Sequence, residues 1–492
     1  MMTESAILLL PIIITGLSPL FIWLFRNNIN KREAASFIAG ILTFASVMTF
    51  VPQVLKGDIP VYSLFEILPG IEVKFCADGL GMIFAIVASF LWILATSYNI
   101  GYMRSLKEHA QTRYYFCFAV AIFGAEGVAL SGNIFTLYLF YEVITVFTYP
   151  LVAHHQDEEG FAGARKYLVY LMGTSKLFLL PAMVMTYNLC GTLDFKLGDM
   201  MTGIFPADAN PVLVQITYFL YVAGLAKAAI MPFHNWLPSA MVAPTPVSAL
   251  LHAVAVVKAG VFSVSRILLS VFGVNVMTDL NLGFATACFA AFTIVAASVI
   301  ALTKDDLKAR LAYSTVSQLS YVVLGVAMLT PSSITGGLAH IAHHAFSKIT
   351  LFFAAGAIYV ATHNKKISLM SGLGRKMPWT FGAFALASLS MIGVPPVCGF
   401  VSKWYMINGA VGAGYTLFMT ALLSSTILNA SYFTPIIFKA FFEAPAAGTD
   451  HAHYSEAPMT MVVPLCFTAL VSVFLGLYPQ VFIRFIQTIK GF

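Results

Sequence analysis

The stretch AKAAIMPFHNWLPSAMVAPTPVSALLHAVAVVKAG, from Ala226 to Gly260, decides how this chain folds. It is mostly apolar and holds four prolines. Its ionisable residues are Lys227, His234, His252 and Lys258. A proline removes a backbone donor and clashes with the preceding helical turn, and at membrane depth such breaks survive only where protein or a water-filled cavity covers them. The stretch therefore predicts a broken membrane helix that carries ionisable side chains.

The composition of the whole chain is that of a membrane protein. Of its 492 residues, 59% are apolar and 10% are charged, where a soluble protein has about 25% charged residues. The mean hydropathy is +0.85. The basic residues behind the net charge of +6 sit in short loops and do not indicate nucleic-acid binding. We expect an all-α polytopic protein, because helices satisfy their own backbone groups in lipid.

The pattern of cysteine and histidine predicts no cofactor and no metal. The six cysteines are scattered without a CxxC pair, and the sequence contains neither HExxH nor a GxxxxGKS phosphate loop. Such spacings are the usual signs of zinc, iron–sulfur or nucleotide sites. We interpret the cysteines as small packing residues.

The apolar runs predict about fourteen membrane-spanning helices, since each span needs about 20 apolar residues. They lie near 5–25, 34–52, 77–102, 114–132, 133–153, 165–190, 211–231, 244–272, 281–302, 308–329, 333–361, 378–408, 412–440 and 456–484. Lysine and arginine are concentrated in the loops after odd-numbered helices, and the other loops carry only Lys56, Lys74 and Lys196. For a bacterial inner membrane, where we expect the protein, the positive-inside rule then predicts odd-to-even loops in the cytoplasm and both termini outside.

A weak internal repeat divides the chain. GTSKLFLLPA around Lys176 is similar to AFSKITLFFAAGA around Lys348. Five helices separate the copies, so they are inverted, as in many transporters. We predict segments 1–113 (helices 1–3), 114–272 (helices 4–8), 273–440 (helices 9–13) and 441–492 (helix 14). Helices 7 and 12 are predicted to be discontinuous, because GVPPVCGF interrupts helix 12 just before Lys403.

Many ionisable residues fall inside the predicted spans. They are Glu126, Glu142, Lys176, Lys227, Lys258, Arg266, His340, His344, Lys348 and Lys403. Each charge at a helix centre costs about 2.5–3.5 kcal/mol on the insertion scale, so such residues are functional hypotheses by default. Burial disfavours the charged form of a lysine, so lysines on separate helices can take up and release protons in turn. The alternative is that each one reaches the interface or joins a static ion pair, which we favour for Arg266 and leave open for Glu126 and Lys176.

One helix carries a stripe of these groups. His340, His344 and Lys348 stand four residues apart and share one face over roughly 12 Å. Imidazole transfers protons near neutral pH. The stripe predicts part of a proton path, and the alternative is a polar seam that joins helices.

Four long segments carry a family resemblance: the opening stretch, DLKARLAYSTVSQLSYVVLG, HIAHHAFSKITLFFAAGAI and MIGVPPVCGFVSKW. With them the chain resembles the antiporter-like family shared by Mrp-type cation/proton antiporters, respiratory complex I and membrane-bound hydrogenases. The resemblance implies fourteen helices with two inverted five-helix half-channels. It also implies that Glu142 pairs with Lys227, that Lys258 is the central lysine, that His344 and Lys348 form a relay, and that Lys403 ends the second half-channel. A lysine at that last position resembles the Mrp D-type subunit.

The leading hypothesis is therefore a proton-translocating subunit of a multisubunit Mrp-type Na⁺/proton antiporter, with other membrane subunits as partners and no catalytic site of its own. The alternative is a proton-pumping subunit of a redox complex, and a third is a structural partner of a soluble module. The predicted proton path contains Glu142, Lys227, His252, Lys258, His340, His344, Lys348 and Lys403. Glu126, Lys176 and His234 are accessory candidates, His252 is the expected bridge between the two lysines, and His234 is expected to bond to freed backbone groups. Since the buried set is poor in carboxylates, the sodium path is expected in another subunit.

Overall fold

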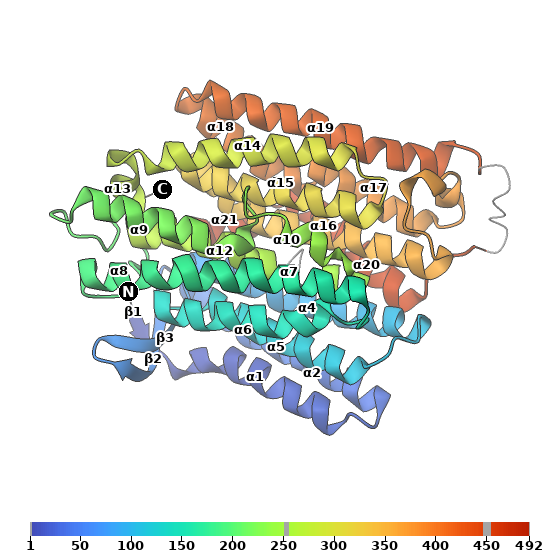
Figure 1. Cartoon of the computed structure of the whole chain (residues 1–492), viewed down its shortest axis with the longest axis horizontal. Coiled ribbons are helices and arrows are strands. Elements are labelled where there is room, and N and C mark those ends of the chain that lie inside the picture. Colours follow the sequence, from blue (N-terminus) through green and yellow to red (C-terminus); the bar gives the residue numbers. More distant parts are fainter. Residues whose placement is uncertain (1, 250–254, 446–453, 492) are drawn as a thin grey trace.

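Long helices run side by side in one bundle, with both chain termini at the same end (Figure 1). The computed structural model describes residues 2–249, 255–445 and 454–491. The first half contains α1 (Leu9–Leu24), α2 (Ile29–Met48), α3 (Val51–Leu55), α4 (Gly79–Ser105), α5 (Gln111–Ala129), α6 (Ile134–Val152), α7 (Glu158–Thr174), α8 (Leu180–Cys190), α9 (Pro211–Gly224), α10 (Trp236–Ser239), α11 (Thr245–Val247) and α12 (Val256–Ile267). The second half contains α13 (Gly273–Asp279), α14 (Leu282–Leu302), α15 (Leu307–Ala327), α16 (Pro331–Thr362), α17 (Pro378–Ile392), α18 (Cys398–Gly412), α19 (Thr416–Phe442), α20 (Met459–Leu477) and α21 (Gln480–Ile486).

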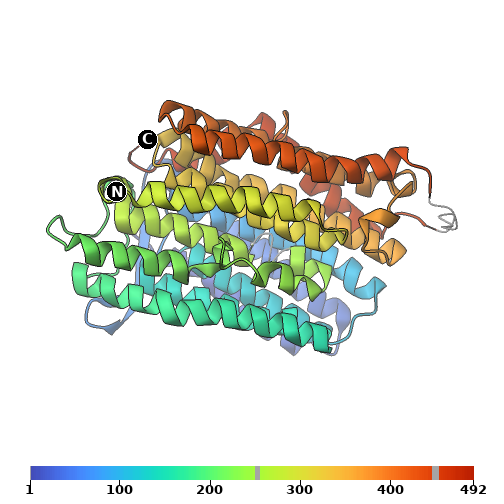
Figure 2. The same ribbon diagram turned by 45° about the horizontal axis from the view of Figure 1, so that its top comes forward.

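The helical membrane fold confirms the prediction. Ten helical segments of the described chain are long and apolar enough to cross a membrane. The other four predicted spans correspond to α5, α9, α15 and the α17–α18 pair. Of these, α9 and α17 are shortened because their spans are interrupted, whereas α5 and α15 carry polar residues in their first turn and are buried along most of their length. Helices α1 and α19 lie on opposite sides of the bundle in both views (Figures 1 and 2).

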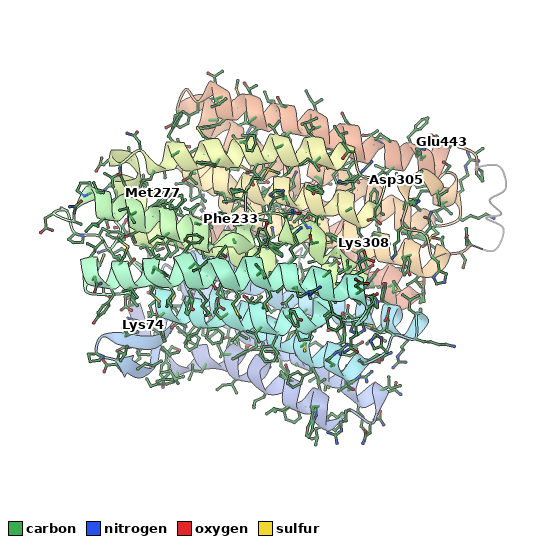
Figure 3. The ribbon with its side chains drawn as sticks, viewed as in Figure 1. Lys74, Phe233, Met277, Asp305, Lys308 and Glu443 are labelled. Carbon is green, nitrogen blue, oxygen red and sulfur yellow. The ribbon has the colours of Figure 1, made fainter. Side chains whose placement is uncertain are left out.

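Both predicted helix breaks are present. After α9 the chain forms one tight turn at Ala226–Ala228, passes through a left-handed residue at Ala229, and resumes as α10. Phe233, inside this break, lies near the middle of the bundle's length, whereas Lys74 and Lys308 lie toward opposite ends (Figure 3). The second break separates α17 from α18. These two interruptions bring irregular backbone to the interior, where the ionisable side chains are.

A glycine lets the helix that carries Lys258 approach the first break. A Cβ atom at Gly260 would lie 2.3 Å from the carbonyl carbon of Lys227 and 2.3 Å from the nitrogen of Ala228. No side chain fits at that distance, so α12 rests directly on the backbone around Lys227. Lys258 and Lys227 therefore lie on two elements that are in direct contact.

A buried ion pair joins two other elements of the core. Arg266 on α12 donates from Nη2 to Oδ1 of Asp78 at 2.6 Å and from Nη1 to the second carboxylate oxygen. Asp78 also accepts from the backbone of Gly81 and so caps the start of α4. Arg266 has the structural partner that the sequence interpretation favoured.

The sequence prediction missed a small sheet near the chain termini. Strands β1 (Met2–Glu4), β2 (Ile59–Leu68) and β3 (Ile71–Cys76) lie in the order β1-β2-β3, with β1 parallel and β3 antiparallel to β2. Lys74 on β3 forms an ion pair of 2.5 Å with Asp194, which holds the sheet against the loop after α8. The sequence predicts a loop here, because the segment lies between two predicted spans and its apolar runs are too short for a further one.

Candidate functional site

The predicted lysines and histidines lie deep in the bundle. Lys227, Lys258, His340, His344 and Lys348 are completely buried, and Lys403 is 4% exposed. They come from the first break, α12, α16 and α18. His252 lies outside the described residues, and its role as a bridge stays a prediction.

Lys227 is held by α6. Its Nζ donates to the carbonyl oxygen of Tyr141 and to Oγ1 of Thr145, both at 2.7 Å. The same Nζ lies 3.1 Å from the centroid of the Tyr141 ring, a position where an aromatic face stabilises a cation. These contacts fix Lys227 at the start of the break.

Glu142 has a different partner from the one that the family resemblance implied. It forms an ion pair with Lys176, with Oε2 and Nζ 3.4 Å apart. Among the described residues no Lys227–Glu142 pair within 4.0 Å is found. The Nζ of Lys176 also donates to the hydroxyl of Tyr138 at 2.5 Å. The physical reason is that Lys176 lies in a π-helical turn, Ser175–Leu179, and its side chain reaches α6. Lys227 is instead hydrogen-bonded to Tyr141 and Thr145.

Lys258 contacts the predicted stripe on α16 directly. Its Nζ is 2.6 Å from Nδ1 of His344. The rings of His344 and His340 are 5.8 Å apart between centroids. The stripe therefore begins at a lysine from a different helix, and three groups that can carry protons follow one another.

His340 continues this row toward the second break. Its Nε2 is 3.0 Å from Oε1 of Gln318, and its Nδ1 is 2.7 Å from Oγ of Ser402. The amide of Gln318 donates to the carbonyl oxygen of Met391 at 3.4 Å. Lys403 donates to that same oxygen at 2.8 Å and to the carbonyl of Ile392 at 2.9 Å. The main-chain oxygen of Met391 thus joins His340, through Gln318, to Lys403.

The break between α17 and α18 creates the site of Lys403. Met391 and Ile392 are the last residues of α17, and the final carbonyls of a helix lack intrahelical partners and attract cations. Gly393 follows with φ of +93°, and a Cβ atom there would lie 2.7 Å from Cδ of Lys403. A glycine both ends α17 and leaves room for the lysine side chain.

A second branch reaches Met391 from Lys348. Its Nζ donates to Oγ of Ser314 at 2.9 Å, and this oxygen is 3.0 Å from the hydroxyl of Tyr432. Tyr432 donates to Oδ1 of Asn429, whose Nδ2 donates to the Met391 oxygen at 3.2 Å. Both ends of the stripe therefore converge on the oxygen that Lys403 contacts.

The accessory candidates lie apart from this row. Glu126 is completely buried, and neither carboxylate oxygen has a hydrogen-bond partner among the described residues. His234 lies beside Pro232 inside the first break, but its Nδ1 has no hydrogen-bond partner within the described chain, so its bonding to freed backbone groups stays a prediction. Freed groups nearby have further partners, because Trp236 donates to the carbonyl of Ala226 and Thr293 accepts from the amide of Met231.

Sequence reasoning missed the uncharged members of the row, which are Ser314, Gln318, Met391, Ser402, Asn429 and Tyr432. One signal was available: DLKARLAYSTVSQLSYVVLG places Ser314 and Gln318 four residues apart on one helix face. Nothing in the sequence indicates that a main-chain oxygen joins two branches, because that position depends on where α17 ends.

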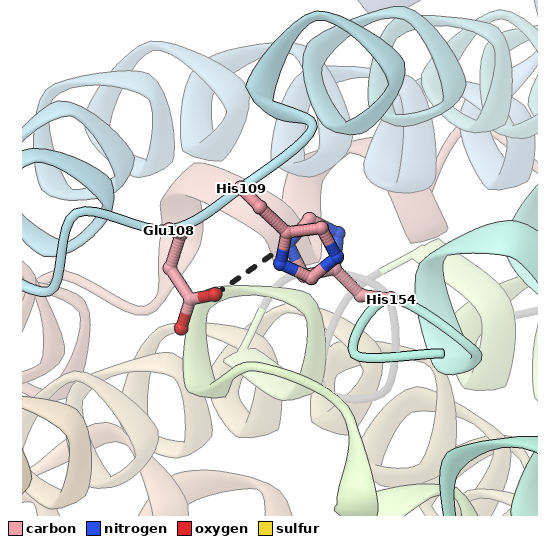
Figure 4. A group of neighbouring side chains, drawn as sticks. All are labelled: Glu108, His109 and His154. Atoms are coloured by element: carbon pink, nitrogen blue, oxygen red, sulfur yellow. Dashed lines mark ion pairs between the residues drawn. The ribbon is translucent and has the colours of Figure 1, made fainter. Parts of the chain in front are cut away.

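A second polar cluster lies in loops at the other end from the termini, where Figure 4 shows Glu108, His109 and His154 side by side. Burial lowers the pKa of His154, which is completely inaccessible. Burial alone raises the pKa of Glu108, but His154 and His155 outweigh it and lower that pKa to about 2. The cluster thus combines an ionised carboxylate with a neutral imidazole at pH 7.

Comparisons with known proteins agree on one family. Residues 131–429 match the family described as NADH:quinone oxidoreductase/Mrp antiporter, transmembrane. Subunit N of the NADH-quinone oxidoreductase of Desulforudis audaxviator (strain MP104C) is 31% identical over 493 residues, which cover 96% of each chain.

Two solved structures share the fold. A chain of the Mrp complex from Dietzia sp. DQ12-45-1b superposes with a TM-score of 0.86 at 21% identity, covering 98% of this chain and 97% of that one. A chain of the membrane-bound sulfane sulfur reductase, an archaeal respiratory membrane complex, gives a TM-score of 0.87 at 24% identity with the same coverage.

Proposed function

The chain belongs to the family of NADH:quinone oxidoreductase and Mrp antiporter transmembrane proteins, and we propose that it is a proton-translocating membrane subunit of a larger assembly. Protons pass along a buried row that runs from Lys227 to Lys258, His344, His340 and Lys403. Glu142 and the half-exposed Lys176 lie beside its first member. Lys348 forms a branch of the row.

The observation that carries this proposal is the direct contact of Lys258 with His344. A pair at 2.6 Å requires one nitrogen to donate and the other to accept. Two fully protonated side chains cannot both be accommodated there, because each would present only donors. The contact therefore supports a site that holds one shared proton and passes it toward His340.

The ion pair of Glu142 with Lys176 controls how much negative charge acts on Lys227. Glu142 directly follows Tyr141 in α6, and Tyr141 holds Lys227 through its carbonyl and its ring. When Lys176 pairs with Glu142, less negative charge acts on Lys227, so its proton is released more easily. When Lys176 moves away, Glu142 stabilises the protonated Lys227. We propose that this exchange loads and unloads the first lysine.

For the assembly, we propose an Mrp-type Na⁺/proton antiporter in a bacterial inner membrane, with odd-to-even loops in the cytoplasm. The lysine at position 403 supports this choice, since it resembles the Mrp D-type subunit. Its ammonium group donates to two carbonyl oxygens at the end of α17, and the end of a helix stabilises a positive charge. The sodium path lies in another subunit.

A second candidate is a proton-pumping subunit of a redox complex. The 31% identity to a quinone oxidoreductase subunit over 96% of both chains favours it. The transport chemistry in this chain is the same in both cases, and only the driving force differs.

Purification of the assembly separates these candidates. An Mrp-type antiporter contains no redox centre and acidifies or alkalinises vesicles in response to a Na⁺ gradient. A redox complex purifies with flavin or iron–sulfur absorbance and pumps protons only with an electron donor. Proton movement that requires neither a Na⁺ gradient nor an electron donor would exclude both assemblies. Proton movement that survives Lys258→Met in the assembled complex would refute the shared proposal.

A further inference from the structure

We propose that Glu108, His109 and His154 form a binding site for a divalent transition-metal ion of the Zn²⁺ class. The site lies outside the proton row and is independent of the proposed function. One ligand atom from each residue lies within 4.8 Å of the other two. Figure 4 shows the carboxylate and both imidazoles turned toward one another from two different loops.

The chain brings these residues together from separate elements. Glu108 and His109 lie in the loop between α4 and α5, and His154 lies two residues after α6 ends. Arg113 donates to the carbonyl oxygen of His154 at 2.9 Å and fixes its backbone. The ring of His154 stands edge-on to Tyr114, with the centroids 5.8 Å apart. The loop that carries His154 is therefore anchored to α5 before any ligand binds.

The buried imidazole of His154 lacks a hydrogen-bond partner among the described residues. It is completely buried, yet neither ring nitrogen has a hydrogen bond within the described chain. Leaving a buried polar group unpaired costs about 1–3 kcal/mol. The nearest group of opposite charge is Glu108, whose Oε2 is 3.7 Å from Nε2, too far for a hydrogen bond. A metal ion between them removes this cost.

The ligand set and spacing fit Zn²⁺. Two imidazoles and one carboxylate, with an open fourth position, are ligands that Zn²⁺ accepts. Bonds of about 2.0–2.1 Å in a tetrahedron put ligand atoms roughly 3.3 Å apart. Closing from 4.8 Å requires a movement of about 1.5 Å, which side chains in loops can make, and His109 is exposed. His155, whose Nε2 is 3.6 Å from Glu108, is available as a fourth ligand.

The charge around the site is mixed. Glu108 and His155 also line a cavity of about 330 Å³ together with Asp157 and Glu159. Lys308 and Lys365 line the same cavity. The Nζ of Lys308 donates a hydrogen bond to the carbonyl oxygen of Ala243 at 2.6 Å, which holds this side chain in place. A bound ion would tie the α4–α5 loop to the α6–α7 loop at the rim of this cavity.

The test is a Co²⁺ titration of the complete, chelator-stripped assembly in detergent, followed by displacement with Zn²⁺. We expect the wild type to bind one more equivalent of Co²⁺ per chain than His109→Ala, with the visible spectrum of a tetrahedral site that Zn²⁺ abolishes. His109 is exposed, so its removal leaves the fold intact, whereas His154→Ala removes a buried ring. Glu108→Gln should weaken the apparent affinity at least tenfold.

The matched control is His363→Asn, at the exposed end of α16 and outside the cluster. It should bind Co²⁺ as the wild type does. A second readout is thermal: Zn²⁺ should raise the Tm of the wild type and of His363→Asn but not of His109→Ala. Equal Co²⁺ uptake and equal Tm shifts in the wild type and His109→Ala would overturn the proposal and leave a Glu–His ion pair.

Discussion

Nζ of Lys258 lies 2.6 Å from Nδ1 of His344, and both side chains are completely buried. One residue comes from α12, which rests on the first helix break, and the other from α16, which leads toward the second. The contact therefore connects the two halves of the row. Charges in the interior of a membrane protein are costly and mark ion pathways.

Loss of the terminal lysine should stop proton exit while leaving the fold intact. Lys403→Met keeps an unbranched side chain of similar size but removes the donor to the carbonyls of Met391 and Ile392. We expect proton transport to fall about tenfold or more, which corresponds to a barrier higher by only about 1.4 kcal/mol. The measurement is ΔpH-driven transport in vesicles at equal amounts of assembled complex. Lys376→Met, in an exposed loop, is the control.

The neutral link at Gln318 should matter as well. Gln318→Leu keeps the volume but breaks the connection between His340 and the Met391 oxygen. We expect slower transport without loss of assembly, by a smaller factor than for Lys403→Met, because the branch through Asn429 remains. Gln215→Leu, on an exposed face of α9, should transport normally. Equal rates for the two variants would show that Gln318 is a packing residue.

The close approach at Gly260 gives a steric prediction. Gly260→Ala places a Cβ atom 2.3 Å from the backbone at Lys227 and Ala228, so α12 must move away from the break. We expect lower transport and a lower Tm. Gly173→Ala on α7 meets nothing within 4 Å and should be neutral or stabilising, since alanine is favoured over glycine in helices. Wild-type transport by Gly260→Ala would show that the spacing between the two lysines is not critical.

The Asp78–Arg266 pair should contribute to stability and not to transport. Removing one partner of a buried pair costs about 3–5 kcal/mol because the other charge is left unpaired. Arg266→Met alone should therefore lower the Tm strongly, and Asp78→Asn combined with Arg266→Met should recover part of it. Vesicle transport per assembled complex should stay near the wild-type rate in the double variant. A selective loss of transport there would place the pair in the proton path.

The exchange of partners at Glu142 is testable with Lys176. Lys176→Met frees Glu142, which then acts on Lys227 alone and keeps it protonated. We expect Lys176→Met to slow turnover, and Glu142→Gln to slow it as well, with the double variant no worse than Glu142→Gln alone. Additive losses would mean that the two residues act independently.

The sequence predicted the features that rest on local chemistry. Prolines such as Pro232 and Pro396 predicted both helix breaks. The four-residue spacing of His340, His344 and Lys348 predicted the stripe on one helix face. These patterns depend only on backbone donors and helix geometry, which single segments reveal.

The parts that were missed depend on contacts between distant segments. The ion pair of Glu142 with Lys176 was missed because a π-helical turn, which the sequence does not show, directs Lys176 toward α6. The convergence on Met391 was missed because it involves a main-chain oxygen. Glu108 and His154 were not connected because 46 positions separate them, and only the packing of two loops brings them together.

The most direct test of the central claim is proton transport by Lys258→Met and His344→Ala in vesicles that contain equal amounts of assembled complex. We predict that each variant transports at about one tenth of the wild-type rate or less, and that the double variant is no slower than the worse single one, because both remove the same shared proton. Transport near the wild-type rate in either single variant would contradict the account.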